Sequence, residues 1–152
     1  MQIAHNVKIT SFCNEGDSLE ETQVSLLTLL PFSDEELEKE KIIIDEEEAT
    51  LDFDRKLTIF SVELTKNRHI NKVLEHIFSI LGEDGKKVLI DTIDSRIDDN
   101  ANFYFRLDKN LFDTGSCELV DHGNCYHFKI NVAAYPAKKK IAKKIILDTL
   151  TK

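Results

Sequence analysis

The sequence predicts an α+β fold: one antiparallel or mixed β-sheet with helices packed on one of its faces. Three observations lead to this prediction. Short segments that alternate polar and apolar residues recur along the chain, as strands with one solvated face require. Other segments repeat their apolar residues at helical spacing. The length of 152 residues suits one domain, so we treat residues 1–152 as a single unit.

The N-terminal part predicts a strand followed by one or two helices. Residues His5–Cys13 alternate and predict the first strand. Ser18 is followed three residues later by Glu21, the pattern of a capping box at a helix start, and Pro31 ends this helix. The acidic stretch Ser33–Glu40 predicts an exposed turn or a short helix.

The middle of the chain predicts two strands and then the clearest helix. We expect strands at Lys41–Asp45 and Lys56–Leu64, separated by acidic residues. The helix begins near Asn67 and stops at Gly82, because its apolar residues recur every 3.6 positions between these two points. A further helical segment starts at Gly85.

The last third predicts three more strands and a final helix. Asn102–Leu107 alternates as a strand, with Tyr104 and Arg106 on its solvent face. Cys117–Asp121 and Cys125–Ala133 flank a turn and predict a hairpin. Pro136 occupies the first-turn position of the last helix, where proline is tolerated.

Charge divides the chain into two unequal parts. The net charge is −8, yet residues 1–54 hold 3 Lys+Arg against 15 Asp+Glu, whereas residues 55–152 hold 17 against 13. Binding a polyanion requires positive charge. Any such site must therefore draw mainly on the later part of the chain.

Composition also predicts the compartment. No apolar run approaches the roughly 20 residues that span a bilayer, and the N-terminus lacks the pattern of a signal peptide. The three cysteines form no paired framework, as in a reducing compartment. We expect a cytoplasmic protein with no membrane partner, either monomeric or dimeric.

Three segments give the chain a resemblance to a known family. They are His5–Gly16, Ser95–Asp98, and Phe103–Lys109 with Gly115 six residues further on. Together they resemble the archaeal RNA-binding protein family known as predicted exosome subunits, over almost the whole chain from His5 to about Tyr135. The resemblance implies a fold similar to that of an RNA-binding ribosomal protein. It also implies RNA as partner, without catalysis, and a link to RNA-processing proteins.

The resemblance implies that the family pattern falls on Arg96, Asp98, Arg106, Asp108, Lys109 and Gly115. Of these, we predict that Arg96, Arg106 and Lys109 contact RNA. Arginine offers a planar fork to a phosphate, and the neighbouring Tyr104 offers a ring to a base. The alternative is that Arg96 or Arg106 forms an internal salt bridge with Asp98 or Asp108.

Lysines crowd the last helix and form the second predicted contact region. Those predicted to contact RNA are Lys138, Lys139, Lys140 and Lys143. They could follow a phosphate backbone through charge alone, without reading sequence. The alternative is a solvated helix surface that complements the acidic N-terminal third.

Cofactor and metal sites are not predicted. Cys117, His122, Cys125 and His127 are of zinc-ligand type, but their spacing is irregular. Asp91, Asp94 and Asp98 share one helix side and could hold Mg²⁺ in a nuclease, although a solvated helix face is the simpler interpretation. No phosphate-cradling glycine loop or catalytic triad is recognisable.

The sequence therefore predicts a non-catalytic accessory protein that binds structured RNA without strict sequence preference. The competing hypothesis is an acidic protein-interaction module with little affinity for RNA, because the first third of the chain could dock on a basic partner.

Overall fold

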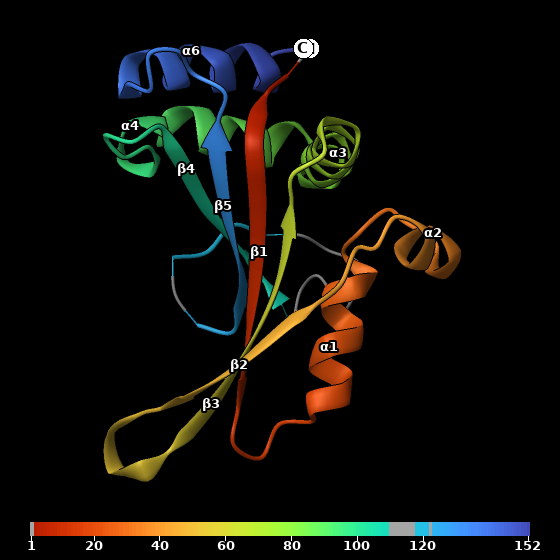
Figure 1. Ribbon diagram of the computed structural model, residues 1–152. Helices are drawn as coiled ribbons and strands as arrows, with labels where there is room; N and C mark the ends of the chain where they lie inside the picture. The colour runs from red at the N-terminus through yellow and green to blue at the C-terminus, as the bar shows by residue number, and fades with distance from the viewer. Residues whose placement is uncertain (1, 110–117, 122) are drawn as a thin grey trace.

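The computed structural model describes residues 2–109, 118–121 and 123–152 (Figure 1). Five antiparallel strands form one sheet in the order β2-β3-β1-β5-β4. Their bounds are β1 Ala4–Asn14, β2 Asp45–Thr50, β3 Lys56–Leu64, β4 Asn102–Asp108 and β5 Cys125–Val132. The predicted class, α+β with a single sheet, is confirmed.

The helices surround the upper and right-hand parts of the sheet in Figure 1. They are α1 Leu19–Thr28, α2 Asp34–Lys39, α3 Asn67–Asp91, α4 Ile93–Arg96 and α6 Lys139–Leu150. Helix α3 bends at Gly82, whose φ of 69° lies in the left-handed region that glycine adopts without strain. The predicted break at Gly82 is thus confirmed, as a kink between two helical halves.

The core lies on one face of the sheet because every central strand alternates. In β1, Val7, Ile9 and Ser11 are buried, and the residues between them point to the opposite face. Ile9 stands opposite Phe128 of β5, whose ring stacks on Phe105 of β4 with centroids 4.6 Å apart. Apolar residues of α1, α3 and α6 complete this cluster.

The second strand does not lie where the sequence predicts it. We expected Lys41–Asp45, with the following glutamates as a separator, but β2 begins at Asp45 and includes Glu46–Glu48. Low strand propensity is overcome here because β2 pairs along its whole length with β3. As an edge strand, β2 keeps its carboxylates in solvent, where acidic residues also discourage pairing with other chains.

The predicted hairpin of Cys117–Asp121 with Cys125–Ala133 is also wrong for its described residues. Strand β5 lies between β1 and β4, and Leu119 instead bridges to Leu107 at the outer edge of β4. Cys117 itself lies outside the described residues. Sequence alternation identifies a strand but does not reveal its partner.

Helix ends follow local capping chemistry. Ser33 and Glu36 form the complete reciprocal capping box of α2, whereas Ser18 supplies only the hydroxyl half of one at α1. The last helix begins at Lys139, three residues after Pro136, so the predicted first-turn place of this proline is wrong.

None of the helices in the described part of the chain has the length and apolarity to cross a membrane.

Replacing Phe128 tests the core. The substitution Phe128→Ala removes a fully buried ring that stacks on Phe105, so it should lower the free energy of unfolding by about 3–5 kcal/mol in urea denaturation. Phe53→Ala is the matched control: its ring is 97% exposed, and we expect a change within about 0.5 kcal/mol. Equal losses for both variants would contradict the assignment of the core.

Candidate functional site

The open face of the sheet carries polar residues in rows across three strands. One row contains Tyr104 of β4, Lys129 of β5 and Lys8 of β1, which stand opposite one another in the strand register. The row beside it contains Arg106, His127 and Thr10. Strand pairing thus gathers three basic residues and a histidine from segments far apart in the sequence.

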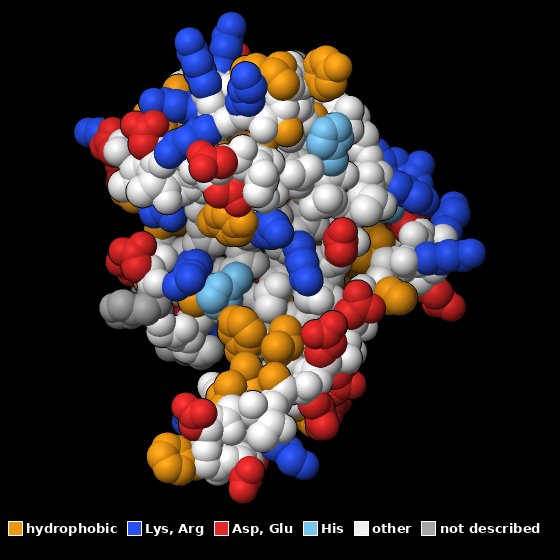
Figure 2. All heavy atoms as spheres, turned by 60° about the vertical axis from the view of Figure 1, so that its left-hand side comes forward, with side chains coloured by type: hydrophobic (Ala, Val, Ile, Leu, Met, Phe, Trp, Pro, Cys, Tyr) orange, Lys and Arg blue, Asp and Glu red, His pale blue; other side chains and the backbone are white. Residues whose placement is uncertain are grey.

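A groove of about 850 Å³ lies over these rows. It extends past the edge strand β4 to Thr92 and Arg96 at the end of the α3–α4 segment, and to Leu119 and Asp121. In Figure 2, basic side chains and a histidine surround a hollow in the middle of the visible face. We call this the sheet groove, defined by Lys8, Arg96, Tyr104, Arg106, His127 and Lys129.

The cations of the sheet groove form no close ion pair with another described residue, although Glu63 of β3 stands opposite Lys8 in the strand register and Asp121 lines the same groove. Lys8 and Lys129 stand directly opposite each other in the register, an arrangement of like charges that destabilises a sheet. Among the described residues, no carboxylate lies within 4.0 Å of either lysine, nor of the guanidinium groups of Arg96 and Arg106. This positive charge remains available to an anionic ligand.

Neutral oxygen atoms hold the two arginines in place. Arg96 Nε donates a hydrogen bond to Thr92 Oγ1 over 2.7 Å, and Arg106 Nη1 donates to the carbonyl oxygen of Asp121. Burial lowers the pKa of Arg96, and the Asp121 carboxylate opposes that shift. A guanidinium stays protonated in proteins, so both arginines keep their charge and a fixed position.

Tyr104 presents an aromatic ring beside these cations. The residue is 40% exposed, and its hydroxyl donates to Asp98 Oδ2 over 2.9 Å. Burial acts to raise the pKa of Asp98, but hydrogen bonds from Asn102, Tyr104 and Asn100 outweigh it and hold the pKa below its ordinary value. Asp98 is thus engaged in holding Tyr104 and the 98–102 turn.

His127 is the titratable group nearest the centre of the site. Its ring packs edge-on against Phe12 with centroids 4.9 Å apart. Burial lowers the pKa of His127, and the charges of Arg106 and Lys109 lower it further. The imidazole is therefore neutral at pH 7 and gains a proton only in more acidic solution, or when an anion binds beside it.

Lys109 does not belong to this surface, although the sequence places it beside Arg106. The residue is only 7% exposed, and its ammonium donates to the carbonyl oxygen of Phe12 over 3.2 Å. The same ammonium lies 5.5 Å from the centroid of the Tyr126 ring. Lys109 therefore joins β4 to β1 in the interior.

The lysines of the last helix form a separate basic region. Lys138, Lys139 and Lys140 lie at the start of α6, while Lys143 forms an ion pair of 2.8 Å with Asp94 of α4. That hydrogen bond and charge lower the pKa of Asp94. Figure 2 shows acidic side chains between the upper basic region and the hollow below it. The two predicted contact regions therefore form no continuous patch.

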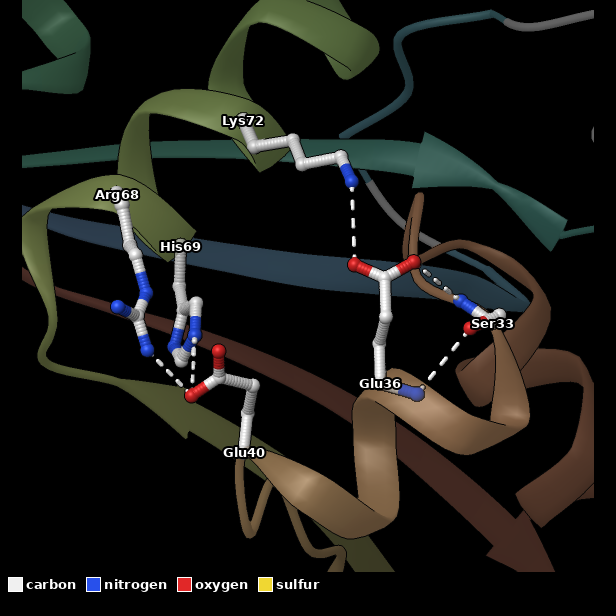
Figure 3. A network of polar contacts seen from close by, with 6 residues as sticks. All are labelled: Ser33, Glu36, Glu40, Arg68, His69 and Lys72. Carbon is white, nitrogen blue, oxygen red and sulfur yellow. Dashed lines mark hydrogen bonds and ion pairs between the residues drawn. The ribbon is translucent and has the colours of Figure 1, made fainter.

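A third basic cluster, at the start of α3, is already paired. Figure 3 shows Glu36 of α2 and Glu40, which follows the end of α2, directed at α3. Glu40 accepts a hydrogen bond from Arg68 and lies 3.6 Å from Lys66, and Glu36 lies 3.4 Å from Lys72. These pairs join two helices, and they contrast with the unpaired cations of the sheet groove.

The structure does not bring the candidate zinc or magnesium ligands of the sequence together among its described residues. Cys117 and His122 lie outside the described residues, and Cys125 Sγ is 3.7 Å from His127 Nε2. Of the three helical aspartates, Asp94 is paired with Lys143 and Asp98 holds Tyr104. Within the described ranges, no three His, Cys, Asp or Glu side chains gather as metal ligands.

Sequence reasoning overlooked half of the groove. It placed Lys8, His127 and Lys129 on solvent faces of their strands, which the burial pattern confirms, but it assigned the two lysines no role and weighed His127 only as a zinc ligand. The missing information was the pairing of β1 with β5. This pairing brings together residues that lie far apart in the sequence. A period-two pattern assigns a face without naming the neighbouring strand.

Several archaeal proteins are similar to this chain over almost its whole length. It is 26% identical over 147 residues to RNA-binding protein PAB1135 of Pyrococcus abyssi, an alignment that covers 97% of this chain and 94% of that protein. The structure of Mth689 from Methanothermobacter thermautotrophicus superposes with a TM-score of 0.76 at 26% identity, over 97% of this chain and 98% of that one. For AF2318 from Archaeglobus fulgidus the TM-score is 0.81 at 22% identity, over 97% and 99% of the two chains.

A family model described as RNA binding matches residues 6–132. This range includes all six residues that define the sheet groove and, except for the first two residues of β1, every strand of the sheet. The chain therefore belongs to this RNA-binding family.

Proposed function

We propose that the chain binds RNA through the sheet groove, with Lys8, Arg96, Arg106 and Lys129 as its phosphate contacts. One observation carries this proposal: the four cations share one open surface, and among the described residues no carboxylate lies within 4.0 Å of any of them. Clustered cations of this kind repel one another in the free protein. A polyanion removes that repulsion and releases counterions as it binds.

The aromatic ring of Tyr104 adds a second kind of contact. It lies in the same row as Lys129 and Lys8, so a strand whose phosphates meet the lysines could stack an unpaired base on the ring. Stacking of this kind tolerates all four bases. We therefore propose that the preferred ligand is structured RNA with an unpaired segment, bound with little sequence discrimination.

The two other predicted regions take different roles in this proposal. The α6 lysines, Lys138, Lys139, Lys140 and Lys143, would supply only long-range attraction, because they are separated from the groove and Lys143 is paired with Asp94. Lys109 would act indirectly, by holding β4 against Phe12 of β1.

A non-catalytic, accessory role beside an RNA-processing or RNA-degrading assembly is the remaining part of the proposal. It is supported by the family resemblance of the Ser95–Asp98 and Phe103–Lys109 segments. Co-purification of the tagged chain with such an assembly after nuclease treatment tests this part. Recovery of the chain without any of its subunits would reject the association and leave the RNA site unaffected.

Removing two groove cations should weaken RNA binding and reduce its salt dependence. For Arg106→Ala/Lys129→Ala we expect the affinity for a stem-loop RNA to fall at least about tenfold at low salt, and the slope of log K against log salt to decrease by about 1.5. Fluorescence anisotropy across a salt series measures both quantities. The matched control is Lys140→Ala/Lys144→Ala, which removes two exposed α6 lysines. An equal loss in the control would move the site to α6.

Tyr104 separates stacking from charge. Tyr104→Leu keeps an apolar side chain without a ring for stacking, so affinity for the stem-loop should fall about tenfold while its salt slope stays unchanged. Tyr104→Phe, which keeps the ring and loses only the hydrogen bond to Asp98, should retain most of the affinity. The stacking role is refuted if the leucine variant binds like the wild type, or if the two variants lose affinity equally.

His127 should make binding tighter in mildly acidic solution. Its pKa lies below the ordinary value of 6.5, so the imidazole is mostly neutral at about pH 7.5, and acidification to about pH 5.5 raises the fraction that carries a proton and a positive charge. Bound phosphate favours that proton further. We expect the ratio of affinities at the two pH values to be several-fold larger for the wild type than for His127→Gln. Identical ratios would show that His127 does not face the bound RNA.

A further inference from the structure

Besides the sheet groove, the hairpin formed by β2 and β3 carries exposed charge that folding alone does not explain. It extends away from the helices at the lower left of Figure 1. The hairpin, residues 45–64, contains seven carboxylates against two cations, Arg55 and Lys56, and six of the carboxylates lie in residues 45–54. All six are exposed, and none forms an ion pair with another described residue. The hairpin is therefore an acidic projection on the same molecule as the basic groove.

The tip of this hairpin exposes an aromatic ring in an unfavourable backbone conformation. Phe53 is 97% exposed, and Phe53 and Asp54 have φ values of 62° and 58°. Two successive left-handed residues are usual at a hairpin turn, but Asn-Gly is the pair that adopts them readily. A phenylalanine here lowers stability and leaves its ring in water. An aromatic residue exposed in this way is suited to anchor an interface.

The strand register divides the hairpin carboxylates into two sets. Asp45 and Glu47 stand opposite Ser61 and Ile59 of β3, and those residues stand opposite Thr10 and Phe12 of β1. Asp45 and Glu47 thus continue the open face that carries the sheet groove, whereas Glu46 and Glu48 belong to the other face. The acidic and basic surfaces consequently face the same way.

We propose that a second copy of this chain covers the groove, each protomer laying its acidic hairpin into the groove of its partner. Charge complementarity selects this occupant: the groove offers four cations to Asp45, Glu47 and the tip carboxylates. Its apolar lining of Phe12, Val88 and Leu119 offers a surface to Phe53. A two-fold axis between groove and hairpin, parallel to the open face, brings each hairpin opposite the other groove. Such an isologous arrangement closes as a dimer.

This contact would couple self-association to the proposed RNA site, since hairpin and RNA would occupy the same groove. The dimer itself does not depend on RNA binding. The hairpin of the partner would cover the groove until a polyanion of higher charge density displaces it. The affinity for RNA would then rise with any change that weakens the dimer and leaves the groove intact.

Sedimentation equilibrium of the purified chain without RNA tests the proposal. At about 50 mM salt we expect a concentration-dependent monomer–dimer equilibrium, which moves to monomer at about 500 mM salt because the contact is electrostatic. Phe53→Ala should weaken the dimer about tenfold. A monomer throughout the concentration series at low salt would overturn the proposal, as would a dimer that Phe53→Ala leaves unchanged.

Charge reversal supplies the decisive comparison. Asp45→Lys/Glu47→Lys and Arg106→Glu/Lys129→Glu should each abolish the dimer, because the reversed side chains then meet like charges on the partner. An equimolar mixture of the two variants should restore it, since the reversed positions of one variant then meet opposite charges on the other. The matched control, Glu46→Lys/Glu48→Lys, reverses charge on the other hairpin face and should dimerise like the wild type. A mixture that stays monomeric would overturn the proposal.

RNA binding is measured separately on the same proteins, so the two proposals fail independently. Phe53→Ala leaves every groove residue in place and should bind the stem-loop RNA at least as tightly as the wild type. If the wild type dimerises as described but binds no RNA, the groove is a self-association surface and the proposed function fails alone.

Discussion

The antiparallel pairing of β1 with β5 is the constraint on which the rest of the structure depends. It joins residues 4–11 to residues 126–132, the two ends of the chain, and it sets two faces at once. Ile9 opposite Phe128 belongs to the core, while Lys8 opposite Lys129 belongs to the open face. A shift of one residue in this register would bury the lysines and expose the core.

The electrostatics of the molecule follow a simple division. Where helices meet, cations and carboxylates form pairs, as between Lys72 and Glu36 or between Lys143 and Asp94. On the open face of the sheet no such close pairs form among the described residues: most of the cations lie in the groove and most of the carboxylates on the hairpin. Separated charges contribute little to folding. Such separation is expected where charge serves binding, and here it concerns both the proposed RNA site and the proposed dimer.

The sequence predicted element types better than element partners. Alternation located β1, β3, β4 and β5 closely, and helical spacing located α3 together with its break at Gly82. The position of the acidic β2 was predicted wrongly because glutamate has a low strand propensity. The strand partner of Leu119 was also predicted wrongly, because strand pairing depends on residues far apart in the sequence, which alternation does not reveal.

By itself, the sequence determined on which face of its strand or helix a side chain lies in the regular parts of the chain, because periods of 2 and 3.6 residues fix that face. It determined that Tyr104 and Arg106 face solvent on their strand. Only the tertiary structure decided that Lys8, Lys129 and Arg96 join Arg106, that Lys109 turns inward to Phe12, and that the α6 lysines lie apart. The reason is physical: local periodicity orients a residue on its own element, whereas strand order and register decide which elements become neighbours.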